Sequence, residues 1–371
     1  MNTSMNVVFT GGGTAGHVSP MLAMADALTK QYRDTDIDAD ILMIGTNEGM
    51  EAELIPDAGY SFATVPKVPM PRSLSKDLFS VPFRLRKAIK RARQLLREHQ
   101  TQVVVGVGGY AATPVYLAAR AEKIPVIVHE GNVRPGLANR LAARFAVVVA
   151  CAFEGTVLPG AIHVGMPMRS DITELPVGPT MKSEARLSLG LAPDKTTLVV
   201  TGGSSGALNL NNAIAGSLDE LLETGAQILH LTGREKTVTD HQGNRIDKPG
   251  YTQVEYIDGL ARVYQTADLI VARSGAGTVH EIAAIGLPSV LVPLPIGNGE
   301  QEYNAAGLKE AGAAVVILDD DFTPQWVASR LPELLRDQPR LEYMAQTAKN
   351  LGIDDAAETM ATIITETKVA R

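Results

Sequence analysis

The sequence predicts an α/β protein made of two Rossmann-like domains, each with a parallel sheet covered by helices. Short runs rich in valine and isoleucine, such as QVVVGV and IPVIV, alternate with helical stretches, as is typical of parallel strands buried on both faces. The order of strand, threonine, glycine turn and helix in NVVFTGGGTAGH recurs in TTLVVTGGSSGALN. A chain of 371 residues also exceeds one ordinary core. We therefore expect two sheets whose carboxyl edges face each other across a central cleft.

The same patterns predict the individual elements. In the first half we expect strands at 7–10, 39–45, 102–107 and 124–130, and helices at 20–30, 84–98 and 113–121. A polar segment punctuated by Pro167, Pro176 and Pro179 indicates the connection between the domains. In the second half we expect a strand at 269–272, a small-residue turn at 273–277, a helix at 278–285 and a strand at 289–293. The last helix, at 355–369, can pack on either domain.

Composition excludes several classes of function. The formal net charge of −7 argues against nucleic acid as a partner. Cys151 is the only cysteine, so no internal disulfide can form, which fits a reducing compartment. The histidines are not spaced as metal ligands, so we expect no structural zinc. Neither a signal peptide nor a run of about 18 apolar residues is found, and we expect a cytoplasmic protein that does not span the membrane.

Three glycine-rich loops follow predicted strands. They are GGGTAGH at 11–17, GVGGY at 106–110 and GGSSGA at 202–207. Glycine lets backbone N–H groups approach a phosphate closely, although glycine turns also serve tight packing alone. Gly11, Gly13 and Gly16 match G-x-G-x-x-G, but the second strand ends in Thr46 and Asn47 without the acid that a dinucleotide site needs, which disfavours NAD and FAD. No P-loop motif occurs.

The stretch ADLIVARSGAGTVHEI at 267–282 organises the second half. A strand that passes through small residues into a helix brings the helix N-terminus to the carboxyl edge of the sheet, where anions bind. Glu281 lies about one turn into this helix, and a carboxylate there can accept hydrogen bonds from a ribose diol. An anion site beside a diol acceptor indicates a nucleotide.

Two residues are candidate general bases. His17 ends a glycine turn at the start of a helix, where the positive end of the helix dipole favours a neutral imidazole. Glu130, in HEGN, is the rival base, or it orders its own loop. The acidic clusters Asp34, Asp36 and Asp38, and 319–321, are interpreted as solvated turns in preference to metal ligands.

The segment from Lys67 to Gln100 stands out by its charge. It holds ten basic and two acidic residues, interleaved with apolar side chains such as Phe79 and Phe83. Such a segment can bind anionic lipid headgroups and insert apolar residues into the interface. It can equally be a helix that packs its apolar stripe on the sheet while its cations meet water. Both descriptions can hold together.

The motifs GGGTAGHVSP, GVGGYAATP, HEGNVRPGLANR, TGGSSGALNLN and ARSGAGTVHEIAAIGLPSVLVPLP with GEQEYNA together resemble the MurG family over nearly the whole chain. These are UDP-N-acetylglucosamine:N-acetylmuramyl-(pentapeptide) pyrophosphoryl-undecaprenol N-acetylglucosamine transferases. The resemblance implies the GT-B fold, with an acceptor- and membrane-binding domain (1–168 with 353–371) and a UDP-sugar donor domain (169–352). It implies transfer of N-acetylglucosamine, with inversion, to the muramyl 4-hydroxyl of lipid I, giving lipid II for peptidoglycan.

The resemblance also implies a set of site residues. His17 corresponds to the family's proposed base. The acceptor diphosphate would lie on Gly12, Gly13, Gly108, Gly109 and Tyr110. The donor contacts would be Thr14, Ala15, Gly16, Asn132, Arg169, Ser204, Asn211, Ile257 (beside the uracil), Ala276, Gly277, Thr278, Val279, His280, Glu281 and Gln301.

The resemblance further implies no tightly bound metal or organic cofactor. It implies a peripheral location on the cytoplasmic face of the plasma membrane, held there by the 67–100 segment. Cell-wall synthesis and division proteins are implied as partners.

Four positions depart from the family's usual residues. Ala15 replaces glycine, Gly131 replaces glutamine, Met166 replaces asparagine, and Glu300 stands where a glutamine pair is common. Ala15 keeps its backbone amide, whereas Gly131 and Glu300 bear on the sugar contacts. Alternative functions are a glycolipid synthase, a UDP-N-acetylglucosamine 2-epimerase, or a non-catalytic module that binds a lipid diphosphate.

Overall fold

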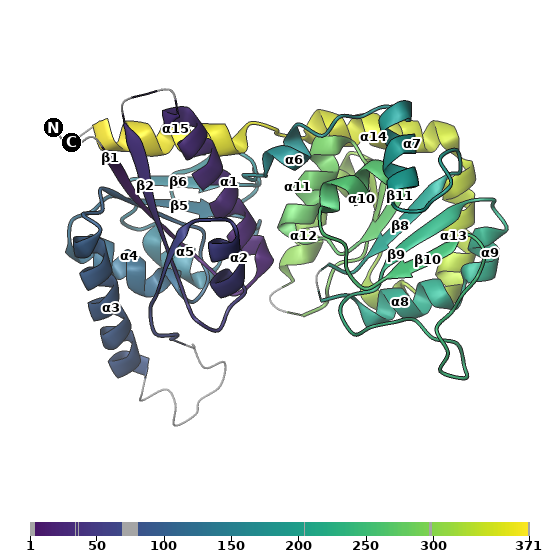
Figure 1. Cartoon of the computed structure of the whole chain (residues 1–371), viewed down its shortest axis with the longest axis horizontal. Helices are drawn as coiled ribbons and strands as arrows, with labels where there is room; N and C mark the ends of the chain where they lie inside the picture. The colour runs from purple at the N-terminus through teal and green to yellow at the C-terminus, as the bar shows by residue number, and fades with distance from the viewer. Residues whose placement is uncertain are drawn as a thin grey trace. The chain divides into compact units, whose positions relative to one another are not determined.

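The computed structural model describes residues 4–33, 35, 37–68, 81–203, 205–296 and 299–369. The chain divides into two compact units, Met1–Arg169 with Ile353–Arg371, and Ser170–Gly352. Each unit holds one parallel sheet flanked by helices (Figure 1). The predicted pair of Rossmann-like sheets is therefore confirmed.

The sheet of the first unit has the strand order β3-β2-β1-β4-β5-β6-β7. Its central strand β1 pairs with both β2 and β4, so that Thr10 at its carboxyl end lies beside Ile44 and Gly106. The glycine loops after β1 and β4 therefore leave neighbouring strands. The strands are β1 (Ser4–Thr10), β2 (Asp38–Gly45), β3 (Ser61–Thr64), β4 (Val103–Gly106), β5 (Val126–Glu130), β6 (Val148–Cys151) and β7 (Ala161–His163).

Helices cover both faces of this sheet because alternate residues of each strand point to opposite faces. Val7 and Phe9 pack with α1 and α15, which lie side by side in Figure 1. Val8 and Val104 pack on the other face with α3 and α4. The helices are α1 (Ala15–Tyr32), α2 (Glu51–Asp57), α3 (Val81–Glu98), α4 (Ala112–Ala121), α5 (Leu137–Ala142) and α15 (Ala356–Val369).

The start of α1 differs from the prediction. The helix begins at Ala15 and Pro20 lies inside it, whereas the sequence analysis placed the first residue at Pro20. Proline lacks only its own N–H, so near the start of a helix it removes a single hydrogen bond and the packed turns on either side persist. His17 consequently lies in the first turn of α1.

The second unit repeats the architecture with the strand order β10-β9-β8-β11-β12-β13. Leu198, Val200 and Val271 pack on one face with α8 and α13. The strands are β8 (Thr197–Thr201), β9 (Gln227–Leu231), β10 (Tyr251–Val254), β11 (Leu269–Ala272), β12 (Ser289–Leu291) and β13 (Ala314–Val316). The helices are α6 (Ser170–Thr173), α7 (Pro179–Ser188), α8 (Leu208–Ala215), α9 (Leu218–Leu222), α10 (Leu260–Thr266), α11 (Ala276–Ile285), α12 (Glu300–Glu310), α13 (Pro324–Arg336) and α14 (Gln338–Leu351).

Helix α11 begins at Ala276, two residues before the predicted start at 278, because the extended Gly275 caps it.

None of the helices in the described part of the chain is both long and apolar enough to cross a membrane.

Candidate active site

The first two glycine loops touch each other. Gly109 has φ +86°, and a Cβ atom placed on it would lie 2.5 Å from the Gly12 carbonyl oxygen. A side chain there would collide with backbone, so the approach of the two loops requires glycine. Tyr110, next in the second loop, is 46% exposed. The predicted diphosphate residues of the first unit are thus gathered at the ends of β1 and β4.

A buried acid that the sequence analysis missed holds the first loop. Glu51, at the start of α2, is fully buried and accepts hydrogen bonds from Gly13 N at 2.8 Å and from Thr46 N at 3.0 Å and Oγ1 at 2.8 Å. Burial alone raises the pKa of Glu51, but these hydrogen bonds outweigh it and the pKa is lowered. The Gly13 N–H is thereby committed to Glu51 and not to a phosphate.

His17 is oriented by its own helix turn. Its Nδ1 lies 3.0 Å from Thr14 Oγ1. With the proton on Nδ1 donated to this hydroxyl, Nε2 is the atom that can accept a proton. Burial lowers the pKa of His17, while the nearby Glu51 carboxylate opposes this shift. His17 is therefore held as the neutral imidazole that a general base requires.

Glu130 is committed to its loop. It is 3% exposed and accepts hydrogen bonds from Asn132 N at 3.0 Å, Gly136 N at 3.0 Å and Asn139 Nδ2 at 2.9 Å. Burial raises the pKa of Glu130 although these donors oppose it. Asn139 also accepts from Tyr116 Oη at 2.8 Å, so one buried network supports the HEGN loop. The loop-ordering interpretation of Glu130 fits this geometry better than the role of base.

Two of the departures from the family pattern lie together. A Cβ atom on Gly131 would be 3.2 Å from Met166 Cε, and Met166 is 2% exposed. The absence of a side chain at Gly131 therefore leaves room for Met166. Asn132 follows, half-buried, and Arg169 is exposed as the last residue of the first unit.

In the second unit, the N-terminus of α11 has open space around its glycines. Cβ atoms placed on Gly275 or Gly277 would meet no atom within 4 Å. The space beside these glycines is therefore open at the end of α11 where the first N–H groups and the positive end of the helix dipole lie. Val279 is 4% exposed, so its side chain belongs to the core and only its backbone can serve a ligand.

The polar residues of α11 have defined partners. Glu281 Oε2 accepts a hydrogen bond from Tyr264 Oη at 2.7 Å. His280 Nδ1 lies 2.8 Å from the Ala276 carbonyl oxygen, so its ring turns back toward the first turn of the helix. Thr278 and Glu281 are half-buried on this helix.

Gln301 joins this group from α12. Its Oε1 accepts a hydrogen bond from Leu294 N at 3.0 Å, and its carbonyl oxygen accepts one from Ser274 Oγ at 2.8 Å.

Arg273, which precedes Ser274 in the chain, is 9% exposed and donates from Nη1 to Asp319 Oδ1 at 2.5 Å. The expectation that 319–321 is merely a solvated turn is therefore wrong for Asp319, because its carboxylate pairs with a buried guanidinium.

The third glycine loop leads into α8, the helix that carries Asn211. Ser204, predicted to contact the donor, lies outside the described residues. Asn211 is 3% exposed; its Nδ2 donates to the Thr232 carbonyl oxygen at 2.9 Å and its Oδ1 lies 3.0 Å from His230 Nε2. Both polar groups of the Asn211 side chain are thus bonded inside the unit, and its contact with the donor remains a prediction. Ile257 is half-buried between β10 and α10.

Metal ligation finds no support within the described residues. Asp34 and Asp36 of the first acidic cluster lie outside them. Among the residues that are described, no group of three or more His, Cys, Asp or Glu side chains could hold a metal ion.

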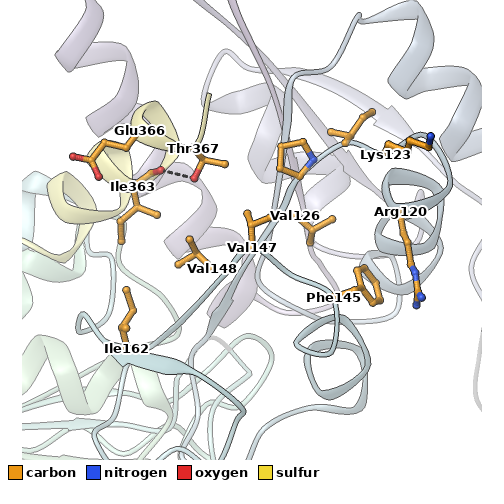
Figure 2. Close-up of a pocket in the computed structure, with 12 residues that line it drawn as sticks. Arg120, Lys123, Val126, Phe145, Val147, Val148, Ile162, Ile363, Glu366 and Thr367 are labelled. Carbon is orange, nitrogen blue, oxygen red and sulfur yellow. Dashed lines mark hydrogen bonds between the residues drawn. The ribbon is translucent and has the colours of Figure 1, made fainter. Parts of the chain in front are cut away.

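A separate hollow of about 620 Å³ lies in the first unit (Figure 2). Val126, Val148 and Ile363 line it, with Arg120 and Lys123 nearby. Val126 begins β5, whereas Glu130 ends it. The hollow therefore lies at the opposite edge of the sheet from the glycine loops and is not part of the candidate active site.

Comparison with known families matches residues 7–151 to the N-terminal domain of glycosyltransferase family 28, and residues 197–360 to its C-terminal domain. A protein of Paenarthrobacter aurescens (strain TC1) is 51% identical over 98% of this chain and 96% of its own length. It is named UDP-N-acetylglucosamine--N-acetylmuramyl-(pentapeptide) pyrophosphoryl-undecaprenol N-acetylglucosamine transferase. The chain belongs to the MurG family of glycosyltransferases.

Other similarities agree with this MurG-family assignment. A Streptomyces avermitilis relative with the same name is 42% identical over 99% of both chains. The crystal structure of Acinetobacter baumannii MurG matches with a TM-score of 0.78 and 30% identity, over 97% of this chain and 99% of that one. The calicheamicin glycosyltransferase CalG4, at 16% identity and a TM-score of 0.65 over 98% of both chains, shares the fold alone. The predicted family, GT-B fold class and enzyme class are confirmed.

Proposed function

We propose that this chain transfers N-acetylglucosamine from UDP-N-acetylglucosamine to the muramyl 4-hydroxyl of lipid I, forming lipid II for peptidoglycan. The names of its MurG-family relatives support this donor and this acceptor. The observation that carries the proposal is the open space at the N-terminus of α11, with Glu281 on the same helix. The helix N-terminus would offer N–H groups to a diphosphate, and Glu281 would offer a carboxylate to a ribose. The first unit supplies the acceptor site and the second the donor site.

Within the second unit we assign the UDP diphosphate to the first turn of α11. Ala276, Gly277 and Thr278 would present backbone N–H groups to it, and Glu281 would accept hydrogen bonds from the ribose hydroxyls. Gln301, fixed by Ser274 and Leu294, would bind the sugar. Because Thr232 and His230 hold the Asn211 side chain, we assign Asn211 no contact with the donor.

In the first unit we assign catalysis to His17. Its Nε2 would take the proton of the acceptor 4-hydroxyl, whose oxygen forms a bond to the anomeric carbon as the bond from that carbon to UDP breaks. The anomeric configuration inverts. Growing charge on UDP would be stabilised by the α11 N-terminus and Arg169, and such preorganised groups can supply the stabilisation that a metal gives elsewhere. Activity should therefore persist in EDTA.

We assign membrane attachment to the amino half of α3. Ala88, Ala92 and Leu95 of this helix are buried, while Phe83 is 79% exposed. The exposed cations of α3 would meet anionic headgroups at the cytoplasmic face of the membrane. Residues 69–80 of the predicted basic segment lie outside the described residues. The exposed cations of α3 in this half are Arg84, Arg86, Lys87 and Lys90.

The test is identification of the product. The protein is incubated with UDP-N-acetylglucosamine and a lipid I analogue, and the analogue is analysed by mass spectrometry. A gain of one N-acetylhexosamine residue by the analogue supports the proposal. Conversion of the nucleotide sugar to its epimer without an acceptor would instead support the 2-epimerase. Binding of the analogue without any transfer would support the non-catalytic module.

A further inference from the structure

A buried tyrosine lies behind the carboxylate assigned to the ribose. Tyr264, on α10, is 2% exposed, and its hydroxyl donates to Glu281 Oε2 at 2.7 Å. The two residues come from different helices, so the bond joins α10 to the face of α11 that carries the donor residues. No pattern in the sequence assigned Tyr264 a role.

The chemistry of this pair makes Tyr264 a permanent donor. Burial, together with the Glu281 charge, raises the pKa of Tyr264 well above 10, although a hydrogen bond from the Thr278 side chain opposes the shift. The phenol therefore keeps its proton at any working pH. A carboxylate that accepts one such bond on Oε2 has its plane fixed, because rotation about the last side-chain torsion would break the bond.

A fixed carboxylate plane matters for binding a vicinal diol. Two adjacent hydroxyls must donate to it in one geometry, and a freely rotating Glu would lose rotational freedom when the diol binds. The Tyr264 bond removes that freedom before the ligand arrives. The bond should therefore raise the affinity for a nucleotide that carries both ribose hydroxyls and not for one that lacks them.

We propose that Tyr264 is a positioning residue for donor specificity, which holds the Glu281 carboxylate in the orientation that accepts the 2′- and 3′-hydroxyls of the UDP ribose. This inference rests on the proposed function, which places the ribose at Glu281. Tyr264 touches neither substrate and acts through Glu281.

The experiment measures the affinities of UDP and 2′,3′-dideoxy-UDP by calorimetry for the full chain and its variants. Tyr264→Phe keeps the ring and removes only the hydroxyl. We expect it to weaken UDP binding about five- to tenfold, which is the cost of ordering one side chain when the ligand binds. Binding of dideoxy-UDP should change by less than about twofold. In the Glu281→Gln background, Tyr264→Phe should cause no further loss of UDP affinity.

Thr266→Val is the matched control. Thr266 lies on the same helix, is fully buried, and donates to the Val263 carbonyl oxygen at 2.7 Å, away from Glu281. It should lower thermal stability about as much as Tyr264→Phe without changing UDP affinity. Equal weakening of both nucleotides by Tyr264→Phe, or no weakening of either, would overturn the proposal. If Glu281→Gln itself leaves UDP affinity unchanged, the ribose placement fails first, and the proposal with it.

Discussion

The carboxylate of Glu51 accepts the Gly13 N–H at 2.8 Å, so that a buried acid from α2 holds the first glycine loop. The same side chain fills the space beside the loop, because a Cβ atom on Gly12 would lie 2.4 Å from Glu51 Oε1. It also opposes the fall in the pKa of His17. One residue outside the glycine motif therefore determines both the shape of the loop and the electrostatics of the proposed base.

Glu51→Gln should destabilise the protein in a pH-dependent manner. The amide would set its NH₂ group against the N–H donors, at a cost of about 1–3 kcal/mol in the free energy of unfolding. The pKa of Glu51 is lowered in the folded state, so its contribution is present above the unfolded value near 4.5 and is lost as the pH falls through the folded pKa. Urea unfolding from pH 7 to pH 3 measures it.

The matched control is Glu48→Gln. Glu48 forms an exposed ion pair with Lys67, with 60% of the glutamate side chain accessible. Its loss should change stability by less than about 1 kcal/mol. Parallel curves of stability against pH for wild type and Glu51→Gln would contradict the role given to Glu51.

His17→Ala should lower kcat by about 10²- to 10⁴-fold at saturating substrates, as expected for loss of a general base. Since burial lowers the pKa of His17, the acid limb of the wild-type kcat profile should lie below pH 6.5. In Glu51→Gln the limb should move to lower pH, because the carboxylate that opposes the shift is gone. His241→Ala, at an exposed position of the second unit, should leave kcat unchanged. A loss of less than about tenfold in His17→Ala would transfer the role of base elsewhere.

His230 predicts a second dependence on pH. It is fully buried between Tyr251 Oη and Asn211 Oδ1, and burial lowers its pKa from 6.5 to about 3. The unfolded imidazole binds a proton below pH 6.5 while the folded one does not, so stability is lost on acidification from pH 6.5 toward about 3. In His230→Gln this loss of stability between pH 6.5 and about 3 should be absent. A wild-type histidine NMR signal from His230 that titrates near pH 6.5 would rule out the explanation.

Charge reversal on α3 tests membrane attachment. Arg84, Lys87 and Lys90 are exposed, and each cation near an anionic surface contributes about 1 kcal/mol. Reversal of all three to Glu should weaken co-sedimentation with phosphatidylglycerol vesicles about 100-fold or more. The matched control reverses Arg330, Arg336 and Arg340, which are exposed in the second unit. Equal binding by both triple variants would remove α3 from the proposal.

Much of this fold could be predicted from the sequence because its signals are local. The strand Leu269–Ala272 has the predicted bounds, since a short apolar run between polar residues admits few alternatives. The start of α1 was misplaced because Pro20 is a strong local signal that packing overrides.

The candidate site could be predicted only where a motif carried it. The glycine loops and Glu281 lie within recognisable patterns. Glu51 and Tyr264 act on loops and helices distant in sequence, through contacts 38 and 17 residues away. A periodicity or motif cannot reveal such pairs. The one available signal for Glu51 is that an acid begins the helix after β2. Asn211 lies within a motif, yet the motif does not indicate that its Oδ1 is bonded to His230.

The central claim is tested most directly by the release of UDP from UDP-N-acetylglucosamine, measured with and without a lipid I analogue. A lipid I transferase holds its donor intact until the acceptor hydroxyl attacks. We therefore predict rapid UDP release that depends on the analogue and falls in His17→Ala. UDP release at the same rate without the analogue, or no release in its presence, would contradict the account.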